Sequence, residues 1–497
     1  MLNNQNRVSN QTRTEKDALG EIEVPINAYF GSFTVRAALN FQLSGLTPST
    51  FFKRALALLK LSACQANTEL GLLADDKSKA IQQAIDEFIA GKFVDEYSLD
   101  YFQAGAGTPL NMNFNEIVAN RANEILGGKL GAYDLVHPNN HVNMGQSSND
   151  VIPTAIRLAS ILYFREQLQP ALQKLIESIS RKGKEGSGVL KVGRTHLQDA
   201  VPMTIEQEFS AWARYIEKSL NFCRKTVSEM YELGIGGTAL GSGITTNPNY
   251  TKTIIKYLKK NTQIEELFIS DNLFEMCQSC DALGAYSSAL RMIANDLNKI
   301  SNDLKILNMG PNAGISELVL PEVEPGSSIM PGKVNPSIVE AVHMVACQVV
   351  GNDAAINMGV AAGQLQLNVM TPMILFNLEL SSSLLKRTAD MMRVYCFDTL
   401  ELNLATTKSL LENSLVFATA LVPYLGYQVV AELVNQALKD KKPIREVALA
   451  HNLMTADQID FVLDPSKVAA PASIDVSLRD KLQTSQNYKD FLVLIGK

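Results

Sequence analysis

The stretch LGAYSSALRMIANDLNKISNDLKIL, residues 283–307, decides the fold class of this 497-residue chain. Its apolar side chains recur at alternating spacings of three and four residues, which is the repeat of one face of a long α-helix. This heptad stripe consists of Leu283, Tyr286, Leu290, Ile293, Leu297, Ile300, Leu304 and Leu307. The stripe predicts a long helix packed in a bundle. Because it is longer than one small domain needs to bury, it also indicates assembly between subunits.

Helical periodicity continues on both sides of the stripe, so we predict a mainly α-helical chain with a central bundle of long helices. The expected helices cover residues 50–73, 77–93, 113–126, 152–182, 203–233, 338–359 and 372–395. One short hairpin is expected near Ile22–Tyr29. We predict three domains: an N-terminal, mostly helical domain (1–147), a central domain of long helices (148–405) and a small C-terminal helical domain (406–497).

Composition limits the functional classes. The formal net charge is -6, from 45 Lys and Arg against 51 Asp and Glu, which argues against nucleic-acid binding. No apolar stretch reaches the length of about 20 residues that a membrane-spanning helix needs. Residues 1–17 are polar and lack the apolar core of a signal peptide, so we expect a cytoplasmic protein that does not bind membranes.

The six cysteines predict neither a disulfide framework nor a zinc site. They stand at positions 64, 223, 277, 280, 347 and 396. Cys277 and Cys280 form a C-x-x-C pair, but no second pair or nearby histidine completes a set of zinc ligands. We expect reduced, structural thiols and no bound metal.

The stretch Gly326–Pro336, GSSIMPGKVNP, is too rich in glycine and proline for a helix or a strand and predicts a loop. Asn335 and Pro336 are a suitable N-cap and first residue for the helix that follows. The loop would then bring Ser327, Ser328 and Lys333 to a helix N-terminus, where free N–H groups and an ammonium favour an anion. The alternative is an ordinary surface turn.

Three other polar segments also lead into helices. Residues 103–113 form a glycine-rich loop containing Thr108, without the lysine or the preceding strand of a phosphate-binding loop. Residues 137–150 end in Ser-Ser-Asn-Asp, where Asn149 or Asp150 can cap a helix. Residues 191–204 contain His196 and end at a Thr-x-x-Gln capping box. Together these segments supply hydroxyls, amides, a histidine and a lysine, which suit a small dianion whose charge grows during reaction.

These segments resemble the signature regions of the aspartase/fumarase superfamily. The Gly326–Pro336 loop is similar to the G-S-S-x-M-P-x-K-x-N motif of that family, and the resemblance extends from about Glu15 to about Thr455. Within the superfamily, residues 103–108, 194–204 and 362–370 most resemble the aspartate ammonia-lyases. The resemblance implies a homotetramer with sites shared between subunits and no cofactor. Activation by a divalent metal is not readable from the sequence.

The resemblance also implies roles for individual side chains. Ser327 would be the general base that removes the Cβ proton, and Lys333 with helix N-terminal N–H groups would stabilise its alkoxide. His196, paired with Glu340, would face the leaving amine together with Asn149. The remaining implied contacts are to the substrate: Thr108, Ser147, Ser148 and Ser328 would bind the aci-carboxylate, while Lys333, Asn335 and Thr195 would bind the α-carboxylate.

The implied reaction is the reversible anti β-elimination of ammonia from L-aspartate to give fumarate. One alternative is fumarate hydratase, which interconverts fumarate and L-malate, and another is an inactive structural homologue.

At three positions the sequence departs from the aspartase pattern, and each departure bears on the identity of the substrate. Pro109 replaces a serine after Thr108, Ser148 stands where aspartases have threonine, and Thr245 replaces an amide in a glycine-rich turn.

Overall fold

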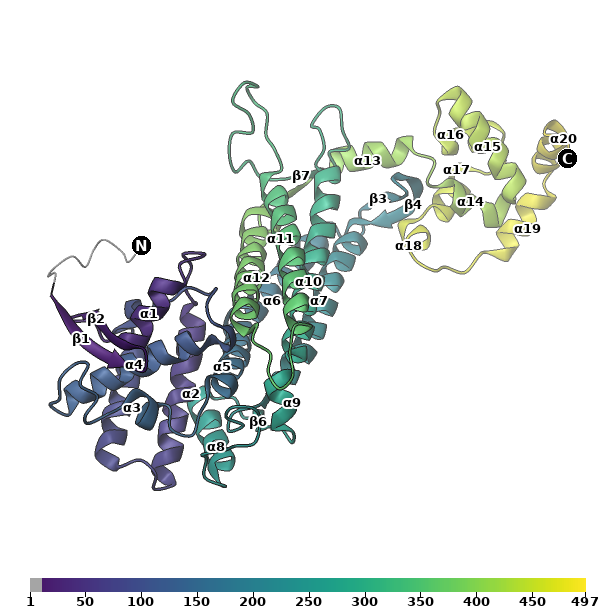
Figure 1. Ribbon diagram of the computed structural model, residues 1–497. Helices are drawn as coiled ribbons and strands as arrows, with labels where there is room; N and C mark the ends of the chain where they lie inside the picture. The colour runs from purple at the N-terminus through teal and green to yellow at the C-terminus, as the bar shows by residue number, and fades with distance from the viewer. Residues whose placement is uncertain (1–10) are drawn as a thin grey trace. The chain divides into compact units, whose positions relative to one another are not determined.

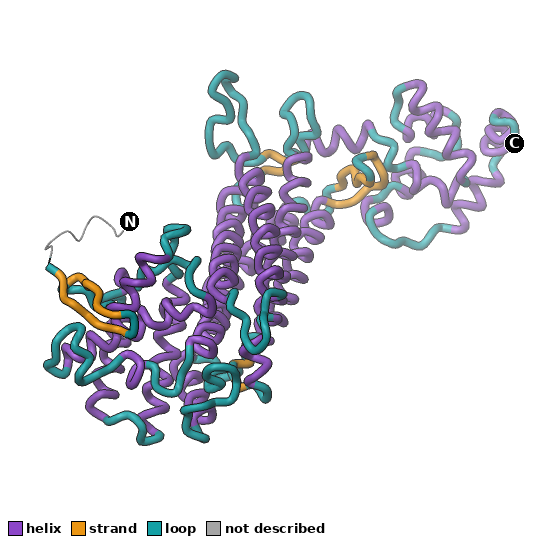
Figure 2. Tube along the Cα trace, viewed as in Figure 1, coloured by secondary structure: helices purple, strands orange, loops and turns teal. Residues whose placement is uncertain are grey.

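A computed structural model of the chain describes residues 11–497 and confirms the mainly helical fold (Figure 1). Helices α1–α20 account for most of the described chain, and the strands form only short two-stranded sheets (Figure 2). Contacts within the chain define two compact units. The first contains Met1–Ala171, Ser219–Asn295 and Val345–Arg387, and the second contains Leu172–Lys218, Asp296–Met344 and Thr388–Lys497. The boundaries of the three predicted domains stay predictions.

The first unit begins with an antiparallel hairpin of β1 (Thr12–Asp17) and β2 (Gly20–Pro25). The hairpin predicted near Ile22–Tyr29 was therefore placed too far toward the C-terminus. The reason is Arg13, whose guanidinium donates to the carbonyls of Pro25, Ile26, Ala28 and Phe30 and so holds the segment after Pro25 in a turn.

Helices near the N-terminus and between the long helices complete the first unit. They are α1 (Ser32–Asn40), α2 (Thr50–Glu69), α3 (Asp75–Ile89), α4 (Thr108–Ile125), α5 (Ser148–Tyr163), α8 (Tyr250–Thr262) and α9 (Leu273–Gln278). Two very short strands, β5 (Glu232–Leu233) and β6 (Phe268–Ile269), pair in parallel.

Five long helices each contribute residues to both units: α6 (Gln169–Glu185), α7 (Ile205–Glu229), α10 (Asp281–Leu307), α11 (Ser337–Val360) and α12 (Thr371–Met392). Within the first unit, Ser287 of α10 donates to Asp353 of α11 at 2.7 Å. Asn352 of α11 donates in turn to Ser381 of α12 at 3.0 Å. Each member of the heptad stripe is at most 6% exposed, so the stripe is a buried seam of this bundle, as predicted.

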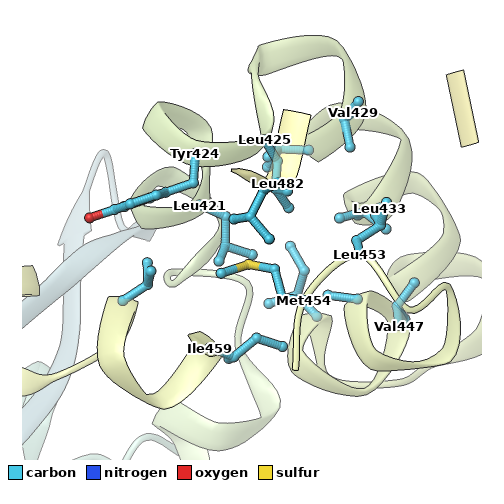
Figure 3. Close-up of a cluster of buried hydrophobic side chains, with 14 of the residues drawn as sticks. Leu421, Tyr424, Leu425, Val429, Leu433, Val447, Leu453, Met454, Ile459 and Leu482 are labelled. Atoms are coloured by element: carbon cyan, nitrogen blue, oxygen red, sulfur yellow. The ribbon is translucent and has the colours of Figure 1, made fainter. Parts of the chain in front are cut away.

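The second unit contains the hairpin of β3 (Leu190–Thr195) and β4 (Gln198–Thr204), together with β7 (Leu318–Val319) paired to β8 (Glu401–Leu402). Its C-terminal helices have a separate apolar core, seen in Figure 3 around Leu421, Leu425, Leu433, Ile459 and Leu482. The helices of this core are α14 (Ala418–Leu425), α15 (Tyr427–Asp440), α16 (Ile444–Ala450), α17 (Ala456–Val462), α19 (Val476–Thr484) and α20 (Gln486–Leu494). The same region contains α18 (Pro465–Val468) and α13 (Leu404–Asn413), and Leu411 of α13 packs with Val192 and Val416 in a smaller cluster.

Two further expectations concern cysteines and membranes. All six cysteines are free; Cys277 lies in α9 and Cys280 lies just before α10. Within residues 11–497, the helices are too short or too polar to cross a membrane.

The buried heptad stripe predicts a large loss of stability when one of its members is truncated. Leu304 is fully buried, so Leu304→Ala should lower the free energy of unfolding by about 2–5 kcal/mol, through lost apolar burial and the cavity left behind. The control is Asn302→Ala, an exposed change on the same helix, for which we expect a change within about 0.5 kcal/mol. Equal urea denaturation midpoints for the two variants would contradict the assignment of this seam.

Candidate active site

The predicted site residues fall into two groups, one in each unit. Thr108, Ser147, Ser148 and Asn149 belong to the first unit, at the N-termini of α4 and α5. The second unit contains the other seven site residues. Thr195 and His196 lie on the β3–β4 hairpin, and Glu340 lies in the first turn of α11. The loop before α11 carries the remaining four: Ser327, Ser328, Lys333 and Asn335.

Helix α4 begins earlier than predicted, at Thr108 instead of Asn113. Proline has no N–H to leave unpaired and its φ suits the first turn of a helix, so Pro109 follows Thr108 in the first turn of α4. The preceding turn needs positive φ angles, which Ala106 and Gly107 adopt. A Cβ on Gly105 would lie 2.6 Å from Cβ of Val369, so glycine permits close packing there. Thr108 is thereby placed at a helix N-terminus.

Ser147, and not Asn149 or Asp150, is the N-cap of α5. Its hydroxyl oxygen accepts from the N–H of Asn149 at 3.3 Å, and Oδ1 of Asp150 accepts from the N–H of Ser147 at 2.9 Å. Serine and aspartate thus form a reciprocal capping box one turn long. The prediction misplaced the cap by two or three residues because several neighbouring residues in this segment are good caps.

Asp150 has a second role that the sequence did not reveal. Its Oδ2 accepts from the N–H groups of Gly236 and Thr238 at 3.0 and 2.9 Å. The carboxyl group is buried, and burial raises the pKa of Asp150 to about 6 although these N–H groups favour the charged form. Through this one side chain, the start of α5 is fixed to the glycine-rich turn of residues 234–243.

Two contacts position the site residues at the start of α5. Nδ2 of Asn111, in the first turn of α4, donates to Oγ of Ser148 at 3.1 Å. Nδ2 of Asn149 donates to the carbonyl of Ala239 at 2.7 Å, which leaves Oδ1 of Asn149 to accept. Two helix N-termini and a set of hydroxyls and amides are therefore held together, which is an arrangement suited to a carboxylate.

In the second unit, the β3–β4 hairpin presents His196 at its tip. His196 and Leu197 are the two turn residues, and both have left-handed backbone angles, with φ of 54° and 61°. Such turns match the twist of paired strands, but non-glycine residues adopt them at an energetic cost. The exposed imidazole follows directly after Thr195.

Buried ion pairs hold the base of this hairpin. The ammonium of Lys191 lies 2.6 Å from Glu208 of α7 and 2.8 Å from Glu317, and the guanidinium of Arg194 lies 3.0 Å from Glu317. Burial raises the pKa of Glu208, against the opposing effect of Lys191. At the end of the hairpin, Thr204 and Gln207 form the predicted capping box, with backbone-to-side-chain distances of 2.9 and 3.1 Å.

The loop before α11 folds around Ser327. Oγ of Ser327 accepts from the N–H groups of Ile329 at 3.2 Å and Met330 at 3.0 Å. The loop is closed by the N–H of Gly326, which donates to the carbonyl of Lys333 at 2.9 Å. A Cβ on Gly326 would lie 2.5 Å from that carbonyl oxygen, so only glycine fits. Two backbone donors therefore already point at the oxygen of the predicted base.

Asn335 does not cap α11, contrary to the prediction. Its Nδ2 donates to the carbonyl of Gly326 at 2.7 Å, and its Oδ1 accepts from the ammonium of Lys333 at 2.8 Å. Because its side chain closes the loop, the helix begins one residue later, at Ser337, and the carbonyl of Pro336 accepts the N–H of Glu340. Lys333 and Asn335 are thus brought together.

The pairing of His196 with Glu340 stays a prediction. Glu340 lies in the first turn of α11, and within residues 11–497 neither its carboxylate nor the imidazole of His196 has a hydrogen-bond or ion-pair partner. In the same range, no group of three His, Cys, Asp or Glu side chains converges as it would around a metal ion.

Comparisons with known proteins give consistent results over most of the chain. A family model described as "Lyase" matches residues 20–351, and one described as "Fumarase C C-terminus" matches residues 417–470. A class II fumarate hydratase of Nitrosomonas europaea is 42% identical over 92% of this chain and 99% of its own length. An aspartate ammonia-lyase of Pseudomonas canavaninivorans is 44% identical over 92% of this chain and 97% of its own. The crystal structure of a fumarate lyase:delta crystallin from Brucella melitensis bound to cobalt has a TM-score of 0.89 and 43% identity, and the match covers 93% of this chain and all of that one.

The contacts of Asp150 predict the effect of removing its carboxyl group. Asp150→Ala should lower the free energy of unfolding by at least about 2 kcal/mol, because three backbone N–H groups lose their acceptor. Asp271→Ala, at an exposed aspartate in the same unit, is the control and should change little. If chemical denaturation gave both variants the wild-type stability, the structural role of Asp150 would be wrong.

Proposed function

Because the chain belongs to the aspartase/fumarase superfamily, we propose that it catalyses the reversible anti β-elimination of ammonia from L-aspartate to give fumarate. The observation that carries this proposal is the environment of Ser327. A serine hydroxyl is too weak a base to take a proton from carbon unless its alkoxide is stabilised. The N–H groups of Ile329 and Met330, which both donate to Ser327 Oγ, supply part of that stabilisation.

The reaction would begin with transfer of the Cβ proton of aspartate to Oγ of Ser327. The electron pair of the broken C–H bond passes into the adjacent carboxylate and forms an aci-carboxylate with one additional negative charge. Collapse of this intermediate forms the carbon–carbon double bond and breaks the carbon–nitrogen bond. No cofactor takes part in the proposed steps.

Binding of the additional charge is assigned to hydroxyl donors. Thr108, Ser147 and Ser148 stand at the N-termini of α4 and α5, where the helix dipoles also favour negative charge. Ser328 would add a fourth donor from the second unit. These interactions strengthen as charge accumulates, so they would favour the transition state over bound aspartate.

The α-carboxylate would bind Lys333, Asn335 and Thr195. The contact between the Lys333 ammonium and Asn335 Oδ1 supports this assignment, because it places a cation and an amide next to each other on the Ser327 loop. The leaving amine would face Asn149 and His196. Glu340 would hold the imidazole of His196 in its working orientation.

Fumarate hydratase is the second candidate function. The Ser147-Ser148-Asn149 segment matches the fumarase pattern, and the similarity to a class II fumarate hydratase is nearly as high as that to an aspartate ammonia-lyase. Elimination of water from L-malate would use the same base and the same carboxylate contacts. The two reactions differ only in the leaving group.

We also propose a homotetramer that assembles through the bundle and shares its sites between subunits. One face of α11 supports this proposal: Cys347, Gly351, Ala354 and Met358 follow each other at helical spacing, and all four are exposed. Small and apolar residues on one face allow close packing of a helix from another copy.

The six free thiols support a reducing compartment, so we assign the reaction to the cytoplasm.

An assay with purified protein separates the candidate reactions. Fumarate is followed by its ultraviolet absorbance, with and without added ammonium. The proposed function predicts that fumarate is consumed only when ammonium is present. Consumption without ammonium would contradict it in favour of the hydratase, and no consumption in either case would support an inactive structural homologue.

Replacement of the proposed base gives a sharper prediction. Ser327→Ala should lower kcat by at least about a thousandfold, because it removes the group proposed to take the Cβ proton. The mass of the assembly in solution should remain that of the wild type, since the exposed loop contributes little to packing. Ser228→Ala, an exposed serine on α7, is the control and should keep full activity. Turnover of Ser327→Ala at the wild-type rate would remove Ser327 as the base.

A further inference from the structure

Lys60 is a buried cation for which the proposed reaction gives no role. It lies on α2, its residue is 1% exposed, and its ammonium donates to Oδ1 of Asn143 at 2.9 Å. Burial lowers the pKa of Lys60 to about 7, while the carboxyl group of Asp150 acts in the opposite direction. An ammonium in an apolar interior is costly, so its presence requires a compensating polar environment.

Asn143 provides the centre of that environment. Its Oδ1 accepts not only from Lys60 but also from Nδ2 of Asn111 at 3.1 Å and from Nδ2 of Asn115 at 3.2 Å. Its own Nδ2 donates to the carbonyl of Gln146 at 3.1 Å. One amide thus connects α2, α4 and the turn that leads into α5.

The side chains that share Asn143 Oδ1 with Lys60 have unused acceptors. Within the described residues, the buried Oδ1 atoms of Asn111 and Asn115 have no hydrogen-bond partner. Lys60 has three protons and, among residues 11–497, one hydrogen bond to an acceptor. The excess of carbonyl oxygens gives the cluster a negative potential that favours the charged form of lysine.

The cluster extends directly to the candidate carboxylate-binding residues. Nδ2 of Asn111 lies within hydrogen-bond distance of both Asn143 Oδ1 and Ser148 Oγ. Gln146, whose carbonyl is held by Asn143, immediately precedes the N-cap Ser147. Lys60 is therefore two side chains away from Ser148 and supports the backbone next to Ser147.

We propose that Lys60, acting through Asn143, is a positioning residue that fixes the polar segment Asn143–Asn149 for a substrate carboxylate. The proposal rests on the proposed function, because that function assigns the carboxylate to Ser147 and Ser148. The ammonium would also add a positive potential beneath the N-terminus of α5, with the same sign as the helix dipole.

The first experiment replaces the ammonium without removing the packing. Lys60→Met keeps the length of the side chain, and Asn143 Oδ1 keeps two donors, so the fold should be retained. We expect the KM for aspartate and the inhibition constant of succinate to rise in parallel, by at least about tenfold. A loss of folded enzyme would lower kcat but leave KM unchanged, so this readout is specific to positioning.

Lys53→Met is the matched control. Lys53 lies two turns earlier on α2, is partly buried, and donates to the carbonyl of Val94 outside the cluster. Both constants should stay within about twofold of the wild type in this variant. Unchanged constants in Lys60→Met, or equal increases in both variants, would overturn the proposal.

A double-mutant cycle tests whether Lys60 acts through Asn143. Asn143→Ala should raise KM, and adding Lys60→Met should cause little further increase, because the connection is already broken. Effects that multiply would show that Lys60 acts by another route and would overturn the proposal.

Hydrogen exchange gives a readout that does not depend on catalysis. Backbone N–H groups of residues 143–150 should exchange faster in Lys60→Met than in the wild type or in Lys53→Met. Unchanged exchange in this segment would overturn the positioning role even if the protein is an active lyase. A wild-type protein without lyase activity would instead defeat the proposed function, while faster exchange would still support positioning by Lys60.

Discussion

The constraint on which the candidate site depends is that backbone N–H groups at the start of a helix need acceptors. At α5, Ser147 and Asp150 meet this need with a capping box, and Asp150 also binds the N–H groups of Gly236 and Thr238. At α4, Oε1 of Gln103 accepts the N–H of Leu110. The hydroxyls and amides left over at these helix ends are the groups proposed to bind substrate. Capping and binding thus use the same short segments, and a change in one affects the other.

In the second unit, contacts between polar and charged groups likewise hold the segments that carry site residues. Lys191, Arg194, Glu208 and Glu317 form a buried ionic cluster at the base of the hairpin that carries His196. Loss of one partner would leave an unpaired charge, typically a cost of about 3–5 kcal/mol when that charge is buried, so these ion pairs stabilise the hairpin at its base. Among residues 11–497, the hydrogen bonds that hold the Ser327 loop all join residues of that loop, most of which are exposed.

Local patterns in the sequence were sufficient for the long helices and for the Thr204–Gln207 capping box, because periodicity and capping involve residues a few positions apart. They failed where the partner is distant in sequence. Asp150 binds a turn more than eighty residues away, and no pattern near Asp150 identifies that turn. Lys60 reads as an ordinary helical lysine, and only the fold reveals that it is buried against Asn143. Asn335 likewise resembles a cap until the loop closes around Gly326.

The central claim is that residues from separate polar loops, supplied by different copies of the chain, combine in one active site. Mixing two inactive variants under conditions that exchange subunits tests it most directly. Ser327→Ala and Asn149→Ala each lose one essential group; if the two groups come from different subunits, roughly a quarter of the sites in a random mixture regain both. The account predicts recovery of about that share of wild-type activity. A mixed assembly that remains as inactive as its parents would contradict it.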